Sequence, residues 1–414
     1  MTEARITQLG QVIGAHTKRI SDCVEDSHHQ PPAVQNGSRP ELPGELSRVR
    51  RELLDATLEL QQLLLGPKEA LFLWARNNQG TIHAVCEFDL ARAFPIGATA
   101  SFGEISQVSG LPEHDVRRIV RHAATEGIFR ESPPGTVQHT AASQMLAEDE
   151  VVRDYMNVCY REIFPAMQQT VPALKRWPGS EDRAQAGFSL SQPGQPAFFD
   201  YLGAHPERAR TFASAMSAYS SGPENDVSHL CHGYPWQALG PATVVDVGGS
   251  TGYVSVALAE QFPQLDLVVQ DTAETIGRDA LTETPRVKRI AHDFFTPQPI
   301  HGADVYLLRM VLHDFVDADC VRILRALIPA LKDGAKVVLN EFCLPEPGTA
   351  GLFEEKQVRT MDMNMLSLFN SRERDTEDWK RLLAQADGRF RWERVLQPEG
   401  SNLSIIEVSW QPVN

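Results

Sequence analysis

Residues 244–262, VVDVGGSTGYVSVALAEQF, join a short apolar run, a glycine-rich turn and a helical pattern, and few folds accommodate that order. Short runs rich in valine are typical of buried strands. Gly248, Gly249 and Gly252 follow the run, and glycine permits a tight turn and a close approach of the backbone to a ligand. The segment therefore predicts a strand, a tight turn and a helix.

The same alternation of strand and helix continues toward the C-terminus. Runs rich in β-branched residues predict strands at 243–247, 265–270, 287–290, 305–308 and 336–340. Helical patterns lie between them, most clearly at 254–261 and 319–331. Strands that alternate with helices form a parallel sheet with helices on both faces. We therefore expect residues 239–414 to form an α/β domain with a doubly wound, mostly parallel, Rossmann-like sheet.

The chain before residue 239 is expected to form three further parts. Residues 1–45 predict an amphipathic helix and then a flexible linker rich in proline and polar residues. Residues 46–150 predict a helical domain, and residues 151–238 predict a helical connector that contributes to a ligand pocket. The N-terminal helix needs a cover for its apolar face, which is formed by Ile6, Leu9, Ile13 and Ile20.

A helix-turn-helix followed by a hairpin is predicted inside the 46–150 part. Ser101 and Glu104 form a possible capping box, and Ile105 and Val108 are expected to face inward. Gly110 ends the first helix. The second helix buries one face, and the residues 128–140 that follow predict a two-stranded wing. This is a winged-helix pattern, with the buried face of the second helix formed by Val116, Ile119, Val120 and Ala123.

Charge bears on what a winged helix does here. Its second helix carries Arg117, Arg118 and Arg121, where a DNA-binding member would read bases. A formal net charge of −15 disfavours a polyanionic partner, because phosphate binding depends on clustered Lys and Arg. We therefore favour a packing or dimerisation module and expect no nucleic acid partner.

The remaining composition favours a cytoplasmic protein. No apolar run approaches the ~18 residues of a membrane span, so we expect no membrane partner. Residues 1–20 carry acids and amides where a signal peptide would be continuously apolar. The six cysteines lie far apart and lack the spacing of metal ligands. We expect reduced thiols and no bound metal.

The glycine turn predicts a nucleotide-like cofactor. Asp246 ends the strand, and the glycines let the backbone come close to a ligand. A dinucleotide fingerprint would need glycine at position 250, where this chain has Ser250. The turn taken alone also fits a purely structural role.

Residues 246–252, D-x-G-G-x-T-G, resemble the first motif of class I methyltransferases that use S-adenosylmethionine. The resemblance implies that Asp246 and the glycines hold this cofactor. It also implies that Asp271, after the second strand, accepts hydrogen bonds from both ribose hydroxyls. Asp293 and Phe294, after the third strand, would then contact the adenine.

His313 follows the strand predicted at 305–308, in LLRMVLHDF. Ligands of doubly wound sheets bind beyond the carboxyl ends of the strands, so His313 is expected at the cofactor mouth. Taken alone, a histidine satisfied by local hydrogen bonds at a helix entrance is the simpler explanation. His313 does not stand alone, because two further motifs follow it in the chain.

LLRMVLHDF, KVVLNEFCLPEPG and MDMNMLSLFNSRERDTEDW together resemble the catalytic half of plant caffeate and flavonoid O-methyltransferases and their fungal relatives. The likeness covers about residues 50–410, including a half through which such proteins dimerise. It implies a homodimer with His313 as general base, assisted by Glu341 in LNE and Glu373 in RERD. One departure is Phe315, where the family usually has tryptophan.

The resemblance also implies binding residues. Arg309 would help to hold the cofactor. An acceptor pocket would be lined by Asp314, Met361, Met365, Phe369 and Asn370. Methionine and phenylalanine at helical spacing are more often simply core residues.

The chemistry explains why a histidine beside carboxylates suits this reaction. A hydroxyl that attacks the sulfonium methyl must lose its proton, and a phenol with a pKa near ~10 is mostly neutral at pH 7. A neutral imidazole can take that proton if a carboxylate on its other nitrogen fixes the tautomer and stabilises the cation. No metal is required.

The expected function is therefore methyl transfer from S-adenosylmethionine to a hydroxyl of a small aromatic or polyketide-like acceptor. Two alternatives stay open. A relative could bind the same cofactor and catalyse a pericyclic or cyclisation reaction without methyl transfer, although His313 argues against it. A DNA-binding regulator is disfavoured by the missing basic patch.

Overall fold

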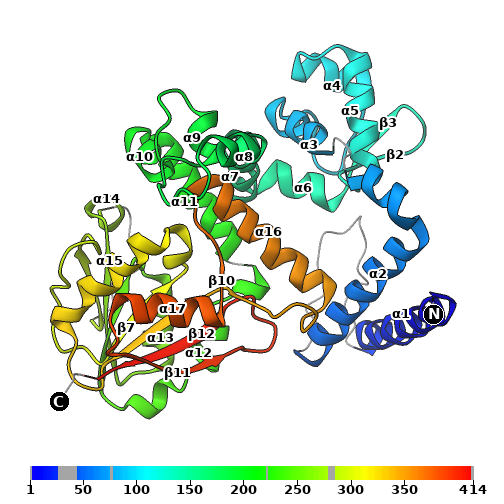
Figure 1. Cartoon of the computed structure of the whole chain (residues 1–414). Coiled ribbons are helices and arrows are strands. Elements are labelled where there is room, and N and C mark those ends of the chain that lie inside the picture. The colour runs from blue at the N-terminus through cyan, green and yellow to red at the C-terminus, as the bar shows by residue number, and fades with distance from the viewer. Residues whose placement is uncertain (1, 27–43, 75–77, 221, 278–284, 412–414) are drawn as a thin grey trace. The chain divides into compact units, whose positions relative to one another are not determined.

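The protein is described by a computed structural model over residues 2–26, 44–74, 78–220, 222–277 and 285–411. The chain divides into two units (Figure 1). The first comprises Met1–Arg161, His205–Tyr219 and Gly351–Phe353, and the second comprises Glu162–Ala204, Ser220–Ala350 and Glu354–Asn414. The linker predicted after the N-terminal helix lies largely at 27–43, outside the described residues.

Two long helices begin the first unit. Helix α1 (Thr2–Asp26) packs on α2 (Gly44–Trp74), which is kinked at Gly66, where φ is 67°. Leu9 on α1 is only 3% exposed, and Arg5 donates to the Glu59 carboxylate of α2. The apolar face predicted for the N-terminal helix is therefore covered in part by α2 of the same chain, since Ile6, Ile13 and Ile20 are only partly buried.

The predicted helix-turn-helix and hairpin are present in the first unit. Helix α4 (Phe102–Ser109) begins with the Ser101–Glu104 capping box and ends at Gly110, whose φ is 75°. Helix α5 (Glu113–Thr125) leads into β2 (Phe129–Glu131) and β3 (Thr136–His139), and β3 also pairs with β1 (Thr99–Ser101). The other elements of this unit are α3 (Asn78–Glu87), η1 (Leu90–Arg92), α6 (Ala141–Glu148), α7 (Glu150–Val158) and α11 (Pro206–Ser220).

The inward face of this module differs from the expectation at one position. Ile105, Val116 and Val120 are fully buried, but Val108 is 66% exposed. Val108 lies in the last turn of α4, one turn beyond Ile105, where no element of the module covers it. The prediction that Val108 faces inward is wrong.

A seven-stranded sheet forms the centre of the second unit, in the order β11-β12-β8-β7-β4-β5-β6. The five strands from β4 to β8 run parallel, and β12 and β11 add an antiparallel edge. Their bounds are β4 (Ala242–Val247), β5 (Leu265–Asp271), β6 (Val287–Ala291), β7 (Val305–Arg309), β8 (Lys336–Glu341), β11 (Phe390–Leu396) and β12 (Ser404–Trp410).

Helices cover both faces of this sheet. Alternate residues of the central strands enter two separate hydrophobic cores. Helices α15 (Asp317–Leu327) and α17 (Thr376–Ala386) pack on one face, and α12 (Ser228–Gly233) and α13 (Tyr253–Gln261) pack on the other. This confirms the doubly wound α/β class expected for 239–414.

Short elements and a helical group complete the second unit. The helices are α8 (Phe164–Arg176), α9 (Gly187–Ser191), α10 (Phe198–Ala204), α14 (Ala273–Ile276) and α16 (Leu352–Phe369), whose first residues belong to the first unit. The shorter elements are η3 (Pro223–Asn225), η4 (Trp236–Leu239), η5 (Leu312–Asp314), η6 (Ile328–Ala330), β9 (Cys343–Leu344) and β10 (Arg374–Asp375), and η2 (Cys159–Ile163) begins in the first unit and ends in the second.

The stretch expected as a connector, 151–238, is divided between the two units. Helix α11 joins the first unit, where Arg208 donates to Asn157 of α7. Helix α8 joins the second, where Thr170 donates to Ser367 of α16. These side-chain contacts link segments far apart in the sequence, so local patterns did not indicate them. Within the described ranges, no helix is both long enough and apolar enough to cross a membrane.

Candidate active site

The glycine turn between β4 and α13 leaves no room for larger side chains. A Cβ atom on Gly249 would lie 2.6 Å from the carboxyl carbon of Asp246. Gly248 has a φ of 75°, and a Cβ there would lie 2.9 Å from Val311. Gly252 has a φ of 91° at the start of α13. The turn therefore presents bare backbone at the carboxyl end of the sheet, where such folds bind ligands.

Two aspartates support this turn. Asp246 is 1% exposed and accepts a hydrogen bond from Ser255 at 2.8 Å. Burial raises the pKa of Asp246 to about 6. Asp271, at the end of β5, accepts the backbone N–H of Ser250 at 2.9 Å. Asp271 is partly exposed, so its carboxylate both fixes the turn and stays available to a ligand.

Asp293 and Phe294 follow β6, as expected. Asp293 accepts the backbone N–H of Phe295 at 3.0 Å. The Phe294 ring lies 3.7 Å from the position of a Cβ on Gly248 and packs edge-on against Phe315. Phe294 therefore lies beside the glycine turn.

Arg309, at the end of β7, donates its hydrogen bonds to other groups of the protein. Its guanidinium donates to Asn340 at 2.9 Å, to the carbonyl of Asn225 at 2.5 Å and to the hydroxyl of Tyr253. Tyr253 opens α13 directly after the glycine turn. In this structure Arg309 thus ties β7 to the start of α13 through protein contacts.

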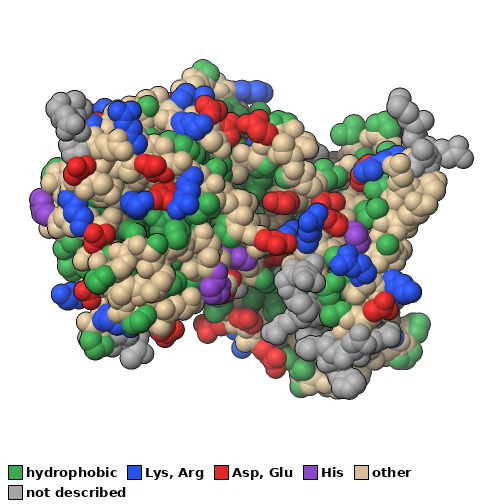
Figure 2. All heavy atoms as spheres, turned by 90° about the horizontal axis from the view of Figure 1, so that it is seen from below, with side chains coloured by type: hydrophobic (Ala, Val, Ile, Leu, Met, Phe, Trp, Pro, Cys, Tyr) green, Lys and Arg blue, Asp and Glu red, His purple; other side chains and the backbone are tan. Residues whose placement is uncertain are grey.

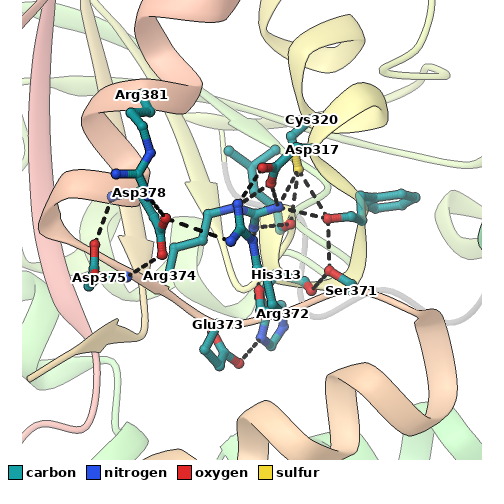
Figure 3. A network of polar contacts seen from close by, with 12 residues as sticks. His313, Asp317, Cys320, Ser371, Arg372, Glu373, Arg374, Asp375, Asp378 and Arg381 are labelled. Atoms are coloured by element: carbon teal, nitrogen blue, oxygen red, sulfur yellow. Dashed lines mark hydrogen bonds and ion pairs between the residues drawn. The ribbon is translucent and has the colours of Figure 1, made fainter. Parts of the chain in front are cut away.

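His313 lies in the turn η5, just beyond β7, and is 5% exposed. Its Nδ1 is 2.8 Å from Oε1 of Glu373, and its Nε2 is 3.5 Å from Oδ1 of Asp314. Figure 3 shows the Glu373 carboxylate directed at the imidazole. Glu373 is itself 2% exposed, and its backbone N–H donates to Asp362 at 2.9 Å. A neutral imidazole with its proton on Nδ1 would leave Nε2 free to accept another.

Glu341 ends β8 and has a different partner from Glu373. Its Oε1 accepts the backbone N–H groups of Val311 and Leu312, at 2.9 and 2.8 Å. Its Oε2 is buried and makes no hydrogen bond. Of the two glutamates, Glu373 therefore contacts the ring of His313, and Glu341 holds the backbone that precedes it.

The carboxylates set the charge of this site. Burial lowers the pKa of His313, but Glu373, Asp314 and Glu341 together outweigh burial and raise it to about 10. Burial raises the pKa of Asp314 to about 6 and that of Glu341 to about 7. The site is therefore built to stabilise an imidazolium cation, which is the form that His313 takes after accepting a proton.

The residues expected to bind an acceptor lie at α16 and after it. Met365 and Phe369 are buried, and the Phe369 ring stacks on Phe199 at 5.4 Å. Met361 is partly buried. Asn370 has a φ of 57° and donates to the carbonyls of Ser180 and Asp182, which is a structural use of its amide.

A group of buried polar residues that the sequence patterns did not indicate contacts the turn of His313. Arg374 is fully buried, and Ser371 is 4% exposed. Both donate to backbone carbonyls of the turn that carries His313, and Arg374 also contacts Asp317. Charged residues in an irregular segment such as RERD usually point to solvent, so the sequence indicated a site role there for Glu373 and not for Arg374.

Comparison with known proteins agrees with this geometry. The family model described as an O-methyltransferase domain matches residues 181–389. A protein named O-methyltransferase kk1A, from Curvularia clavata, is 36% identical over 99% of this chain and 98% of its own length. This match includes the glycine turn and the turn at His313.

Two solved structures share the fold. One, titled as the crystal structure of OxaC in complex with SAH and oxaline, has a TM-score of 0.77 at 21% identity and covers 99% of this chain and 100% of that one. Another, titled "A Pericyclic Reaction enzyme", has a TM-score of 0.77 at 20% identity and covers 97% of this chain and 100% of that one. At these identities the likeness concerns the fold.

Proposed function

Since this chain belongs to the family of S-adenosylmethionine-dependent O-methyltransferases, we propose that it methylates a hydroxyl group of a small aromatic acceptor and that His313 removes the hydroxyl proton. The observation that carries this proposal is the buried contact of 2.8 Å between His313 and Glu373 at the carboxyl end of β7. A base placed where the acceptor meets the methyl donor can take the hydroxyl proton as the methyl group moves.

The chain's own residues perform three tasks in this proposal. Glu373 fixes the tautomer of His313 and stabilises its cation, so that Nε2 accepts the hydroxyl proton. Glu341 holds the backbone of Val311 and Leu312 and so sets the start of the turn. The buried surroundings exclude water from the charged pair, which strengthens their electrostatic interaction.

The glycine turn fits S-adenosylmethionine. Residues 246–252 offer backbone groups, the single carboxylate of Asp246 and no basic side chain, which suits a ligand without phosphate groups. When bound, the cofactor supplies a methyl group on a positively charged sulfur, and this charge opposes protonation of a nearby imidazole. We assign cofactor contacts to Gly248, Gly249, Asp271, Asp293 and Phe294.

Asp271→Ala is expected to weaken S-adenosylmethionine binding by about 10-fold or more, because a hydrogen bond to a charged group contributes about 1.5–3 kcal/mol. Calorimetric titration measures the dissociation constant directly. Asp266→Ala is the matched control, since Asp266 is an exposed aspartate on the same strand β5. Equal affinities in the two variants would end the role of Asp271.

Aromatic side chains around the site favour a flat acceptor. Phe199 stacks on Phe369 at 5.4 Å and on Phe315 at 5.9 Å, and Phe294 packs on Phe315. We assign acceptor contacts to this group together with Asp314, Met361 and Met365. Incubating the protein with S-adenosylmethionine labelled in its methyl group and a panel of phenols tests the proposal, because label must appear in an ether product.

The pericyclic alternative predicts a different result in the same experiment. The fold is shared with an enzyme titled for such a reaction. An acceptor analogue that rearranges without gaining label would favour this alternative. The buried His313–Glu373 pair favours methyl transfer, because a base with a stabilised cation serves proton removal.

We propose that the protein is a homodimer whose first unit, with a winged-helix module, makes the contact. Helix α2 exposes Leu64, Leu71 and Phe72 by 64–67% of their surface, which a partner copy would cover. The arginines of α5 are paired with acids, since Arg117 contacts Glu113, and Arg121 contacts Glu131. On the face shown in Figure 2, basic side chains stand among acidic ones, which does not favour a nucleic acid partner.

Light scattering at micromolar concentration is expected to give about twice the chain mass of 46.0 kDa. Deleting residues 1–45 should weaken the dimer, because α1 packs on α2 and its loss removes the support of the helix that carries Leu64, Leu71 and Phe72. A monomer with full activity at every concentration would contradict the proposal. We also propose a cytoplasmic location, because the six cysteines form no disulfide in the described part of the chain and a reducing compartment keeps thiols reduced.

A further inference from the structure

We propose that Arg374 is a positioning residue that holds the turn of His313 in register with the Glu373 carboxylate. The inference rests on the proposed role of His313 as the base. It adds a residue that contacts neither cofactor nor acceptor and acts on the reaction through another side chain.

Arg374 is a buried charge, and its shortest hydrogen bonds go to residues 312, 315 and 317. It is 0% exposed, and its guanidinium lies over the Trp379 ring at 5.2 Å. It donates to the carbonyl of Leu312 at 3.0 Å, to that of Phe315 at 2.9 Å, and to Asp317 at 2.7 and 3.0 Å. A buried cation costs several kcal/mol unless it is fully paired. Here the pairing is with the residues on either side of His313.

Ser371, three residues before Arg374, also binds the turn of His313. Its hydroxyl lies 2.5 Å from the carbonyl of His313 and 2.7 Å from that of Phe315. Cys320 of α15 also contacts the carbonyls of Leu312 and Phe315, at 3.1 and 3.3 Å. Side chains therefore bind the carbonyls of residues 312, 313 and 315. The turn itself supplies one backbone hydrogen bond among these, from the N–H of Phe315 to the carbonyl of Leu312.

Glu373 lies between Ser371 and Arg374 in the sequence. One segment therefore binds the carbonyls of the turn and also places the Glu373 carboxylate at His313. Figure 3 shows Ser371, Glu373 and Arg374 reaching the turn of His313 from one strand of chain. Arg374 also pairs with Cys343 in the short ladder of β10 and β9. This ladder connects the segment to the chain that follows Glu341. The separation of 2.8 Å between Glu373 and His313 is thus fixed by the contacts of Arg374 and Ser371.

A positioning role differs measurably from a role in stability alone. Loss of stability reduces the amount of folded enzyme and leaves the pH profile of the remainder unchanged. Loss of position weakens the contact of His313 with Glu373, the carboxylate that raises the pKa of the imidazole. The pKa of His313 then falls. Because the base must be unprotonated, the acidic limb of kcat/KM moves to lower pH.

The test is Arg374→Lys, which keeps the charge and loses the fork that reaches two carbonyls and a carboxylate together. We expect kcat to fall about 10- to 100-fold, as small displacements of a catalytic group do. The KM of the acceptor and the dissociation constant of S-adenosylmethionine should stay within about threefold. The acidic limb should move to lower pH.

Arg372→Lys is the matched control. Arg372 contacts the same Asp317, at 2.5 Å, but its side chain is 48% exposed and touches no carbonyl of the turn. We expect this variant to keep the kcat and pH profile of the wild type. Ser371→Ala serves if Arg374→Lys fails to fold, and it should shift the limb in the same direction.

Two results would overturn the inference. One is a folded Arg374→Lys enzyme with unchanged kcat and an unmoved acidic limb. The other is a loss of activity in Arg374→Lys and Ser371→Ala that is fully explained by a smaller amount of folded protein. If His313→Ala stays active, the proposed base itself fails. If His313→Ala is inactive and Arg374→Lys is fully active, only the positioning role fails.

Discussion

Replacing His313 with alanine or glutamine is expected to reduce methyl transfer by about 10²- to 10⁴-fold, the contribution typical of a general base. The dissociation constant of S-adenosylmethionine should stay within a few-fold, because the imidazole contacts Glu373 and Asp314 and lies outside the glycine turn. Single-turnover assays with labelled cofactor measure the first quantity, and calorimetry measures the second.

The control for this prediction is His301→Ala. His301 is an exposed histidine shortly before β7 in the same unit, so its removal changes the histidine content without touching the buried pair. Activity within about twofold of wild type in either His313 variant would remove the residue from the mechanism.

Local patterns were enough to predict the centre of the fold. The strands β4, β7 and β8 read as apolar runs because their residues are buried on both faces. The glycine turn was recognisable because bulkier residues would collide there with Asp246 and Val311. His313 followed from its place just after β7, since ligands of such sheets bind at that edge.

The antiparallel edge of the sheet was not predicted. Strand β11 has mainly exposed and partly exposed residues after Phe390, including Arg391, Glu393 and Arg394. A charged run of this kind reads as a solvated segment. Its pairing with β12 depends on a turn and on backbone hydrogen bonds, which local side-chain patterns do not report.

The partners of the site residues also depend on contacts between distant segments. Glu341 and Glu373 were equal candidates for the imidazole, and only the fold separates their roles. The amide of Asn370 reaches carbonyls at residues 180 and 182, close in space and far in sequence. Arg374 is buried because a carboxylate and two carbonyls meet its guanidinium, and no periodicity signals such a site.

The separation of the two glutamates leads to a second large effect. Glu373→Gln is expected to lower kcat by about 10²-fold or more, because an amide removes the counter-charge that lies at Nδ1 of the imidazolium. Glu341→Gln should cost less than about 10-fold, since the amide keeps an oxygen for the N–H groups of Val311 and Leu312. Burial raises the pKa of Glu341, which disfavours its charged form and so reduces the cost of a neutral amide at this position.

The pH dependence gives the sign of the Glu373 effect. Burial lowers the pKa of His313, and the surrounding carboxylates raise it to about 10, above its ordinary value. Because the base acts when unprotonated, kcat/KM of the wild type should rise with pH, with its acidic limb above the ordinary histidine range near ~6.5. Removing the Glu373 charge lowers the pKa of His313, so the limb of Glu373→Gln moves to lower pH while the plateau falls. Equal losses in the two glutamine variants, or an unmoved limb in Glu373→Gln, would show that Glu373 does not act through the charge of His313.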